Sequence, residues 1–168
     1  MYDLLTRVSQ IESTVPYQPE YPLKYDSTFG PWKPIISREE SLMQDFKFLI
    51  LTEPGEWPMN PDLGVGIRKY LFEPYSSDLL NGVEARIQDQ LEKYLPRVKL
   101  LAAKFSTSPA EIDGGKTSLL IRYSIMGAVQ KISKIETSEK GYLNMETKGY
   151  SISQADSIMP LGSKVKTI

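Results

Sequence analysis

The 168-residue sequence contains no cysteine and no histidine. Without cysteine no disulfide can form, and zinc or iron–sulfur sites built from cysteine and histidine are excluded. Without histidine, both Ser-His-Asp and Cys-His catalysis are excluded, and so is the side chain that most often acts as a general base near neutral pH. Any catalysis would have to depend on carboxylates, lysine, tyrosine or a metal site made of oxygen ligands.

The sequence also lacks an excess of positive charge and a long hydrophobic run. It has 20 lysines and arginines against 21 acidic residues, which gives a formal net charge of −1. Proteins that bind nucleic acids usually carry a clear basic excess, so we expect no nucleic-acid partner. The longest apolar runs, such as Phe48–Leu51, are far too short to span a bilayer, and residues 1–12 do not resemble a signal peptide. We therefore expect no membrane partner either.

The residue pattern predicts an α+β protein with three regions. Residues 1–36 form an N-terminal helix and an arm, residues 37–135 form the core domain, and residues 136–168 form a C-terminal extension that ends in a loose tail. Within the core we expect two main helices, over residues 37–52 and 76–95, packed on a small antiparallel sheet. Ser37 is the expected N-cap of the first helix, with Glu40 three residues on, and Gln90 is among the polar residues expected to lie away from the apolar face of the second helix. The strands are expected over residues 97–105 and 117–126, joined by a turn at Asp113–Lys116, with further strand segments at 128–135 and 141–152.

The N-terminal region combines a helix pattern with an arm rich in proline and aromatic residues. Leu4, Leu5, Val8 and Ile11 have helical spacing. Five of the 12 prolines follow between Pro16 and Pro34, and proline disfavours both helices and central strands. The arm also contains Tyr17, Tyr21, Tyr25, Phe29 and Trp32. These aromatic side chains could pack on their own domain or on a neighbouring subunit, and the sequence leaves both interpretations open.

Carboxylates and glycines lie between the two helices, where they could form a site of chemistry. Glu53, Glu56, Asp62 and Glu73 could supply a glycosidase pair, but such a pair needs a cleft and a carboxyl group with a raised pKa. The simpler interpretation is that these acids accept hydrogen bonds in turns and at helix ends. Gly64 and Gly66 lack the rest of a nucleotide-binding motif, so we expect them to allow positive φ or close packing. We therefore predict no catalytic, cofactor or metal-binding residues.

Residues Leu49–Pro74 resemble a family signature. A helix ends in a Thr-Glu-Pro-Gly-Glu turn, which is followed by Met-Asn-Pro-Asp-Leu-Gly-Val-Gly-Ile, an apolar turn and Leu-Phe-Glu-Pro. This order is similar to that of the baseplate wedge proteins of contractile-tailed phages, the gene-product-25-like family, which has relatives in type VI secretion and contractile injection baseplates. The resemblance extends over Ser37–Met126. The signature residues are Pro54, Gly55, Glu56, Asn60, Pro61, Asp62, Gly64, Gly66, Phe72, Glu73 and Pro74.

The family has a second hallmark, a Glu-Pro-Arg triplet that follows a tyrosine at the end of the second helix. In this chain the corresponding residues are Tyr94-Leu95-Pro96-Arg97. The triplet is implicated in docking to the helical core bundle of the wedge, so the resemblance makes Tyr94, Pro96 and Arg97 candidate wedge-docking residues. Leu95 replaces the family glutamate, which removes one charged contact.

The resemblance implies a structural role in the tail baseplate of a virion assembled in the host cytoplasm. Family members link the wedge to the first sheath ring and start sheath assembly by accepting strands at a sheet edge. Leu119, Ile121, Tyr123 and Ile125 of the expected strand 117–126 are then the candidate sheath-binding strand residues, with the strand segment 128–135 as the second candidate. The implied partners are the sheath protein and the wedge core-bundle proteins, with tail tube or hub proteins as further candidates. The alternatives are a carboxylate-based lysozyme activity, or the equivalent subunit of a type VI secretion or contractile injection system.

Overall fold

The computed structural model describes most of the chain as two compact units. The described residues are 15–28, 30–71, 77–106, 118–125, 129–137, 143–149, 154 and 157–159. One unit ends at Phe46 and the other begins at Lys47, so the division lies inside a helix. The expected N-terminal helix and the turn at Asp113–Lys116 lie outside the described residues. Each unit is described below by itself.

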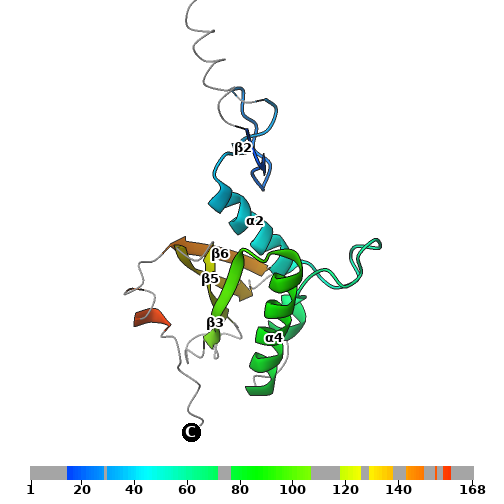
Figure 1. Cartoon of the computed structure of the whole chain (residues 1–168), viewed down its shortest axis with the longest axis vertical. Helices are drawn as coiled ribbons and strands as arrows, with labels where there is room; N and C mark the ends of the chain where they lie inside the picture. The colour runs from blue at the N-terminus through cyan, green and yellow to red at the C-terminus, as the bar shows by residue number, and fades with distance from the viewer. Residues whose placement is uncertain are drawn as a thin grey trace, which may run out of the picture. The chain divides into compact units, whose positions relative to one another are not determined.

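The first unit is the arm and the beginning of helix α2, Arg38–Leu51 (Figure 1). The arm folds back on itself, because the short strands β1, Gln18–Pro19, and β2, Pro34–Ile35, pair antiparallel. Proline has no N–H to donate, which is consistent with strands of only two residues each. The predicted cap at Ser37 is present: its hydroxyl accepts a hydrogen bond from the Glu40 amide at 3.5 Å, and its carbonyl accepts one from the Ser41 amide.

The second unit combines helices with a four-stranded antiparallel sheet, which confirms the mixed α+β class. Helix α3, Ile67–Leu71, is a single short turn, and helix α4 spans Ser77–Tyr94. The strands are β3, Val98–Ser106; β4, Ser118–Ile125; β5, Val129–Thr137; and β6, Leu143–Gly149. They lie in the order β3-β4-β5-β6, so each pairs with the next strand along the chain. Helix α4 lies against β3 (Figure 1).

The core of the second unit is centred on strand β4. Its apolar face is as predicted, with the side chains of Leu119, Ile121, Tyr123 and Ile125 fully buried. Val83 and Ile87 of α4 are fully buried as well. Ser118, Arg122 and Ser124, on the other face of β4, are also buried, whereas Leu120 is partly exposed, so the strand is largely covered on both faces.

The C-terminal part of the chain is more closely packed than the sequence suggested. Strand β6 belongs to the main sheet, although it lies in the region assigned to the extension. Met159, in the segment expected to be a loose tail, is buried, and its carbonyl accepts a hydrogen bond from Nη1 of Arg122 at 2.6 Å. The expectation of a loose tail is therefore wrong at this residue, because the buried guanidinium of Arg122 holds it. No helix in the described ranges is long and apolar enough to cross a bilayer.

Candidate functional site

The segment between α2 and α3, residues 52–66, forms the signature loop. Its end is fixed to the last turn of α2 by main-chain hydrogen bonds: the Val65 amide donates to the Leu49 carbonyl and the Gly66 amide to the Thr52 carbonyl. The Gly55 amide donates to the Pro61 carbonyl at 2.8 Å and so closes the loop across its middle. Backbone hydrogen bonds of this kind satisfy groups that would otherwise need water, and they give the loop one defined shape.

Helix α4 holds the other side of the signature loop. Oε1 of Gln90 accepts a hydrogen bond from the Gly64 amide at 2.8 Å, and Nε2 of Gln90 donates to the Asp62 carbonyl at 3.1 Å. Nη2 of Arg86 donates to the carbonyls of both Asp62 and Gly64 at 2.9 Å. One turn further along the helix, the Tyr94 hydroxyl donates to Oδ1 of Asn60 at 2.9 Å. Residues four apart share a helix face, so three side chains of α4 form a clamp on the loop.

The burial of Gln90 is a correction to the sequence analysis. Gln90 was grouped with the polar residues expected on the outer face of α4, but its exposed fraction is only 2%. The signal was present in the spacing, because Gln90 lies three residues after Ile87 and seven after Val83, on the apolar stripe. A buried carboxamide has to be hydrogen-bonded on both its oxygen and its nitrogen, and the signature loop satisfies both groups.

Gly64 and Gly66 are required by the close approach of the two ends of the signature loop to each other. Both have positive φ angles, +107° and +68°. A Cβ atom at Gly64 would lie 2.3 Å from the carbonyl oxygen of Thr52, and one at Gly66 would lie 2.8 Å from Cδ of Pro54. Only glycine fits such contacts without moving the backbone. This agrees with the prediction that the two glycines serve conformation and packing.

The carboxylates of the loop act locally in the described structure. Oε2 of Glu56 accepts a hydrogen bond from the Glu53 amide at 3.2 Å, as expected of an acid in a turn. Oε1 of Glu53 is buried and has no hydrogen-bond partner in the structure as described. Glu73, with its neighbours Phe72 and Pro74, lies outside the described residues. Within the described part of the chain, no three acidic side chains are grouped so that they could hold a metal ion.

The signature loop and the elements around it match a known protein family. A family model described as baseplate wedge protein gp25 matches residues 36–130, more than half of the chain. The chain belongs to the baseplate wedge protein gp25 family. The matched range contains α2, the loop, α4 and the strands β3 and β4, so the resemblance seen in the sequence is confirmed.

Three solved structures are similar to this chain. One is the crystal structure of a tail lysozyme candidate from Geobacter sulfurreducens, with 23% identity, a TM-score of 0.44, and coverage of 68% of this chain and 90% of that one. A second is the baseplate of the anti-feeding prophage, with 17% identity, a TM-score of 0.49, and coverage of 88% and 94%. A third is the postcontracted baseplate of pyocin R2, with 23% identity, a TM-score of 0.49, and coverage of 62% and 99%. No curated protein matches the chain.

The three candidate wedge-docking residues of this gp25-family chain differ in their surroundings. Tyr94 is half-buried and its hydroxyl holds Asn60, with Nζ of Lys93 5.1 Å from the centre of its ring. Pro96 and Arg97, in contrast, are exposed directly after α4. Arg97 forms no ion pair with any residue that the structure describes. Tyr94 therefore has a structural task inside the chain, whereas the guanidinium of Arg97 is turned to solvent.

The candidate sheath-binding strand is not an edge strand, which corrects the sequence analysis. Strand β4 pairs with β3 on one side and with β5 on the other, from Ser118 to Ile125. Leu119, Ile121, Tyr123 and Ile125 are therefore in the middle of the sheet, and neither their backbone nor their buried side chains can accept a further strand. The second candidate, residues 128–135, falls on β5, which is also paired on both sides.

The two outer strands of the described sheet are β3 and β6. The outer edge of β3 is partly occupied, because the Ala103 amide donates a hydrogen bond to Oε1 of Glu84 on α4 at 3.1 Å. On β6, the side chains of Glu146, Thr147 and Lys148 are exposed. Charged side chains are typical of an edge strand that has to avoid unspecific pairing. Strand β6 is therefore the more accessible edge of the described sheet.

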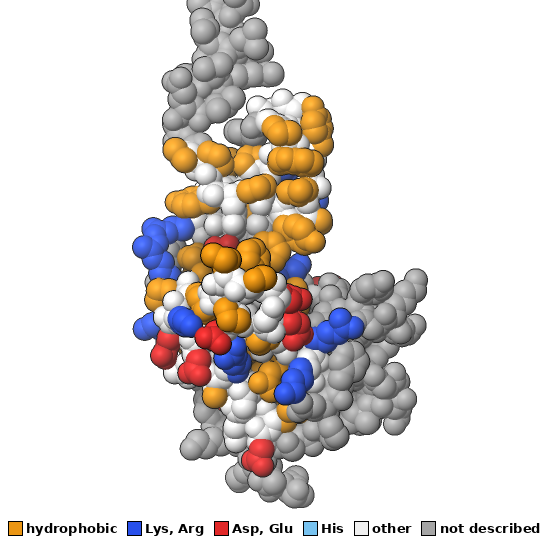
Figure 2. Space-filling model, turned by 90° about the vertical axis from the view of Figure 1, so that its right-hand side faces the viewer, with side chains coloured by type: hydrophobic (Ala, Val, Ile, Leu, Met, Phe, Trp, Pro, Cys, Tyr) orange, Lys and Arg blue, Asp and Glu red, His pale blue; other side chains and the backbone are white. Residues whose placement is uncertain are grey.

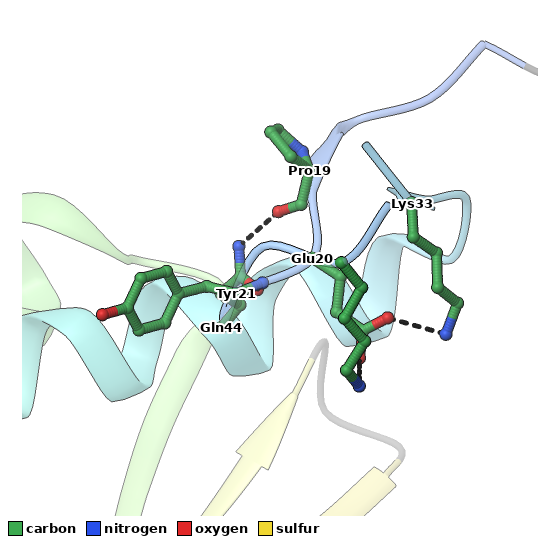
Figure 3. Close-up of polar contacts among 6 residues, drawn as sticks. Pro19, Glu20, Tyr21, Lys33 and Gln44 are labelled. Carbon is green, nitrogen blue, oxygen red and sulfur yellow. Dashed lines mark hydrogen bonds and ion pairs between the residues drawn. The ribbon is translucent and has the colours of Figure 1, made fainter. Parts of the chain in front are cut away.

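The arm is fastened to α2 by two glutamine side chains. Gln44 donates to the Pro19 carbonyl and accepts from the Tyr21 amide, and Gln18 donates to the Ser41 carbonyl and to Asp45. Figure 3 shows the contact between Gln44 and Pro19 and, nearby, the ion pair between Glu20 and Lys33. Glu20 also pairs with Lys24 at 2.8 Å.

The aromatic residues of the arm remain at its surface. Tyr17, Tyr21, Tyr25 and Trp32 are exposed to between 47% and 77%, and hydrophobic side chains cover much of the visible face of the arm (Figure 2). Within its own unit, the arm therefore does not bury these aromatic side chains. Phe29 lies outside the described residues.

Proposed function

We propose that this gp25-family chain is a structural subunit of a contractile-tail baseplate, where it links the wedge to the first sheath ring and starts sheath assembly. The observation that carries the proposal is the family match over residues 36–130, which includes both helices and the signature loop. The machine is a phage tail, with a type VI secretion or contractile injection baseplate as the alternative. On this proposal the chain is assembled in the host cytoplasm and is carried in the tail baseplate.

The structure favours β6 as the strand to which a sheath strand is added. In β-augmentation, main-chain hydrogen bonds give affinity and alternating side chains give selectivity. The edge of β3 is partly covered by α4 through Glu84, whereas β6 is the outer strand on the opposite side of the described sheet. Glu146 and Lys148 are two residues apart and so share one face of β6. We expect the incoming strand to carry the complementary pair of charges.

The test is seeded assembly of the tail sheath protein from the same particle. Purified chain should shorten the lag of sheath polymerisation, measured by light scattering and electron microscopy. The Lys148→Glu variant should lose most of this seeding, because it places a like charge opposite the incoming strand. Lys104→Glu is the matched control on exposed Lys104 of β3 and should seed normally. Loss of seeding in the control alone would move the site to β3, and a folded wild-type chain that never seeds would overturn the proposal.

Wedge docking is assigned to Arg97 together with Pro96. The planar guanidinium offers five donors to carboxylates or carbonyls, and Arg97 is exposed at the end of α4. The variant Arg97→Ala should weaken binding to the wedge core-bundle proteins in a pull-down with purified components. Arg68→Ala, at another exposed arginine of the same unit, serves as the control. Equal binding by both variants would contradict this assignment.

We also propose that the chain works without catalysis. The support is that Glu56 holds the backbone of its own turn, which is a structural task. A cell-wall hydrolysis assay on the purified chain should show no activity above the background. If activity is found and Glu53→Gln, Glu56→Gln or Glu73→Gln abolishes it while the variant stays folded, the lysozyme alternative replaces this proposal.

A further inference from the structure

The tip of the signature loop, Trp57–Met59, exposes large apolar side chains. Met59 is 95% exposed and Trp57 is 58% exposed. The loop extends away from α4 (Figure 1), and Figure 2 is turned so that this side faces the viewer. Tryptophan and methionine are enriched at the cores of protein interfaces and depleted on ordinary surfaces. Such a pair at the end of a loop needs an explanation beyond the stability of the chain.

The tip is held in one conformation by its own base. The Asn60 amide donates to the Trp57 carbonyl at 2.9 Å, and the Leu63 amide donates to the Asn60 carbonyl at 3.1 Å. The side chain of Asn60 is fixed in turn by the Tyr94 hydroxyl. Prolines at positions 54, 58 and 61 each lock one φ angle. A preorganised loop loses little conformational entropy on binding, so its exposed side chains can serve as anchors.

The charge around the tip indicates the kind of surface that it fits. Residues 52–64 contain three acidic residues and no lysine or arginine, and two of the acids, Glu56 and Asp62, are exposed. An anionic membrane surface would repel this loop, as would the equally acidic loop of a second copy. A protein pocket with an apolar floor and a basic rim would attract it, because complementary charge assists association and selects partners.

We propose that Trp57 and Met59 anchor this chain in an apolar pocket, rimmed by lysine or arginine, on a neighbouring protein of the assembled particle. The proposal rests on the proposed function, because it places the pocket in the baseplate. It adds a third contact surface, separate in sequence from Arg97 and from β6. Asp62 and Glu56 face the basic rim, and the clamp of α4 keeps the anchor in position.

The experiment uses particles produced by a strain in which the native gene is replaced by variants. A photoreactive benzoyl-phenylalanine at position 59 should crosslink the chain to one partner polypeptide, at a peptide that contains lysine or arginine. The same probe at Ala85, an exposed position on α4, should not give this product. Met59→Asp should lower incorporation into particles roughly tenfold relative to Met59→Leu, because a carboxylate loses its hydration when it is placed in an apolar pocket, whereas leucine does not. Asp62→Asn should reduce the dependence of incorporation on salt concentration.

Each other result has a definite meaning. If the chain is present in particles but position 59 gives no crosslink and Met59→Asp is incorporated like Met59→Leu, the anchor proposal is overturned and the proposed function stands. Crosslinks to lipid or to a second copy of this chain also overturn it. If particles form normally without the chain and never contain it, the proposed function fails and the anchor proposal fails with it. Circular dichroism of each purified variant establishes that it is folded.

Discussion

The carboxamide oxygen of Gln90 lies 2.8 Å from the amide nitrogen of Gly64, and this hydrogen bond joins the middle of α4 to the end of the signature loop. The two residues are separated by 26 positions in the sequence. Because the same side chain also donates to the Asp62 carbonyl, a single buried glutamine fixes two points of the loop backbone. The stability of the chain and the position of its exposed tip therefore depend in part on this side chain, together with Arg86 and Tyr94 of the same clamp.

Replacing Gln90 with leucine should destabilise the chain. The substitution leaves the Gly64 amide without its acceptor in a buried position, and an unsatisfied buried polar group costs about 1–3 kcal/mol. The expected result is a loss of about 2 kcal/mol in the free energy of unfolding, measured by urea denaturation. Gln88→Leu is the matched control, because Gln88 is exposed on the same helix and should change stability by only about 0.5 kcal/mol. Equal losses in both variants would show that the loop contacts of Gln90 contribute nothing.

Three glycine-to-alanine variants should separate backbone strain from steric clash. Gly82 lies in α4 with open space around it, so Gly82→Ala should stabilise the chain by about 0.5–1 kcal/mol. Gly55 has φ +94° but nothing within 4 Å, and its variant should lose about 1–3 kcal/mol through strain alone. Gly64 has both a positive φ and the carbonyl of Thr52 at 2.3 Å from the added Cβ. Gly64→Ala should therefore lose about 4 kcal/mol or more, or fail to fold.

The order of stability of the three glycine variants is the decisive measurement. Urea denaturation and soluble yield should place Gly82→Ala above the wild type, Gly55→Ala below it, and Gly64→Ala lowest. A Gly64→Ala variant as stable as Gly55→Ala would mean that the two ends of the loop can move apart at little cost. The loop would then not be the rigid support that the anchor at its tip requires.

Arg122 should tolerate no replacement, even by lysine. It is fully buried on β4, with Nε and Nη2 bonded to Oε1 of Gln130 and Nη1 bonded to the Met159 carbonyl. The single ammonium group of lysine cannot donate hydrogen bonds in the fixed planar directions of a guanidinium group. Arg122→Lys should lose about 2–3 kcal/mol in the free energy of unfolding, because the buried charge then lacks part of its hydrogen bonding. Arg68→Lys, at an exposed arginine of α3, should be nearly neutral; similar values for both would contradict the role of the guanidinium.

Much of the fold could be predicted because the signals are local. The helices α2 and α4 follow from apolar spacing, the start of α2 from the cap at Ser37, and the β3–β4 pair from alternation on both sides of a turn. The signature loop was found as a sequence motif, and its glycines were interpreted correctly. These features depend on residues a few positions apart, which a sequence displays directly.

The errors concern contacts between residues that are distant in sequence. The inner place of β4 is decided by β5 and β6, whose few apolar residues, such as Ile132, Ile135 and Met145, gave only a weak strand pattern. The burial of Gln90 depends on backbone groups of the loop 26 residues away. Likewise, Met159 is held by Arg122, 37 residues earlier. Alternation shows which face of a strand is apolar, but it does not show which strands lie at the edge of a sheet.

The ion pairs of Glu20 predict how the arm responds to acid. Its carboxylate accepts hydrogen bonds from Lys24 at 2.8 Å and from Lys33 at 2.6 Å, and these contacts lower the pKa of Glu20 below the ordinary value of 4.5. Because the folded chain holds this proton less tightly than the unfolded chain, the stabilisation is complete above the unfolded pKa. It is lost as the pH falls through the lower, folded pKa. An NMR titration of the full chain should find the pKa of Glu20 below 4.5.

The same titration on variants should identify the cause of the shift. Lys24→Met and Lys33→Met should each raise the pKa of Glu20, with the larger effect from Lys24, whose hydrogen bond makes the largest contribution. Salt at about 1 M should raise it as well, since both pairs are exposed and surface charges are screened. Arg38→Met, at an exposed residue of the same unit, should leave it unchanged. If neither lysine variant moves the pKa, the two pairs do not hold the arm in solution, and the fold of the arm then depends on Gln18, Gln44 and the main-chain pairing of β1 with β2.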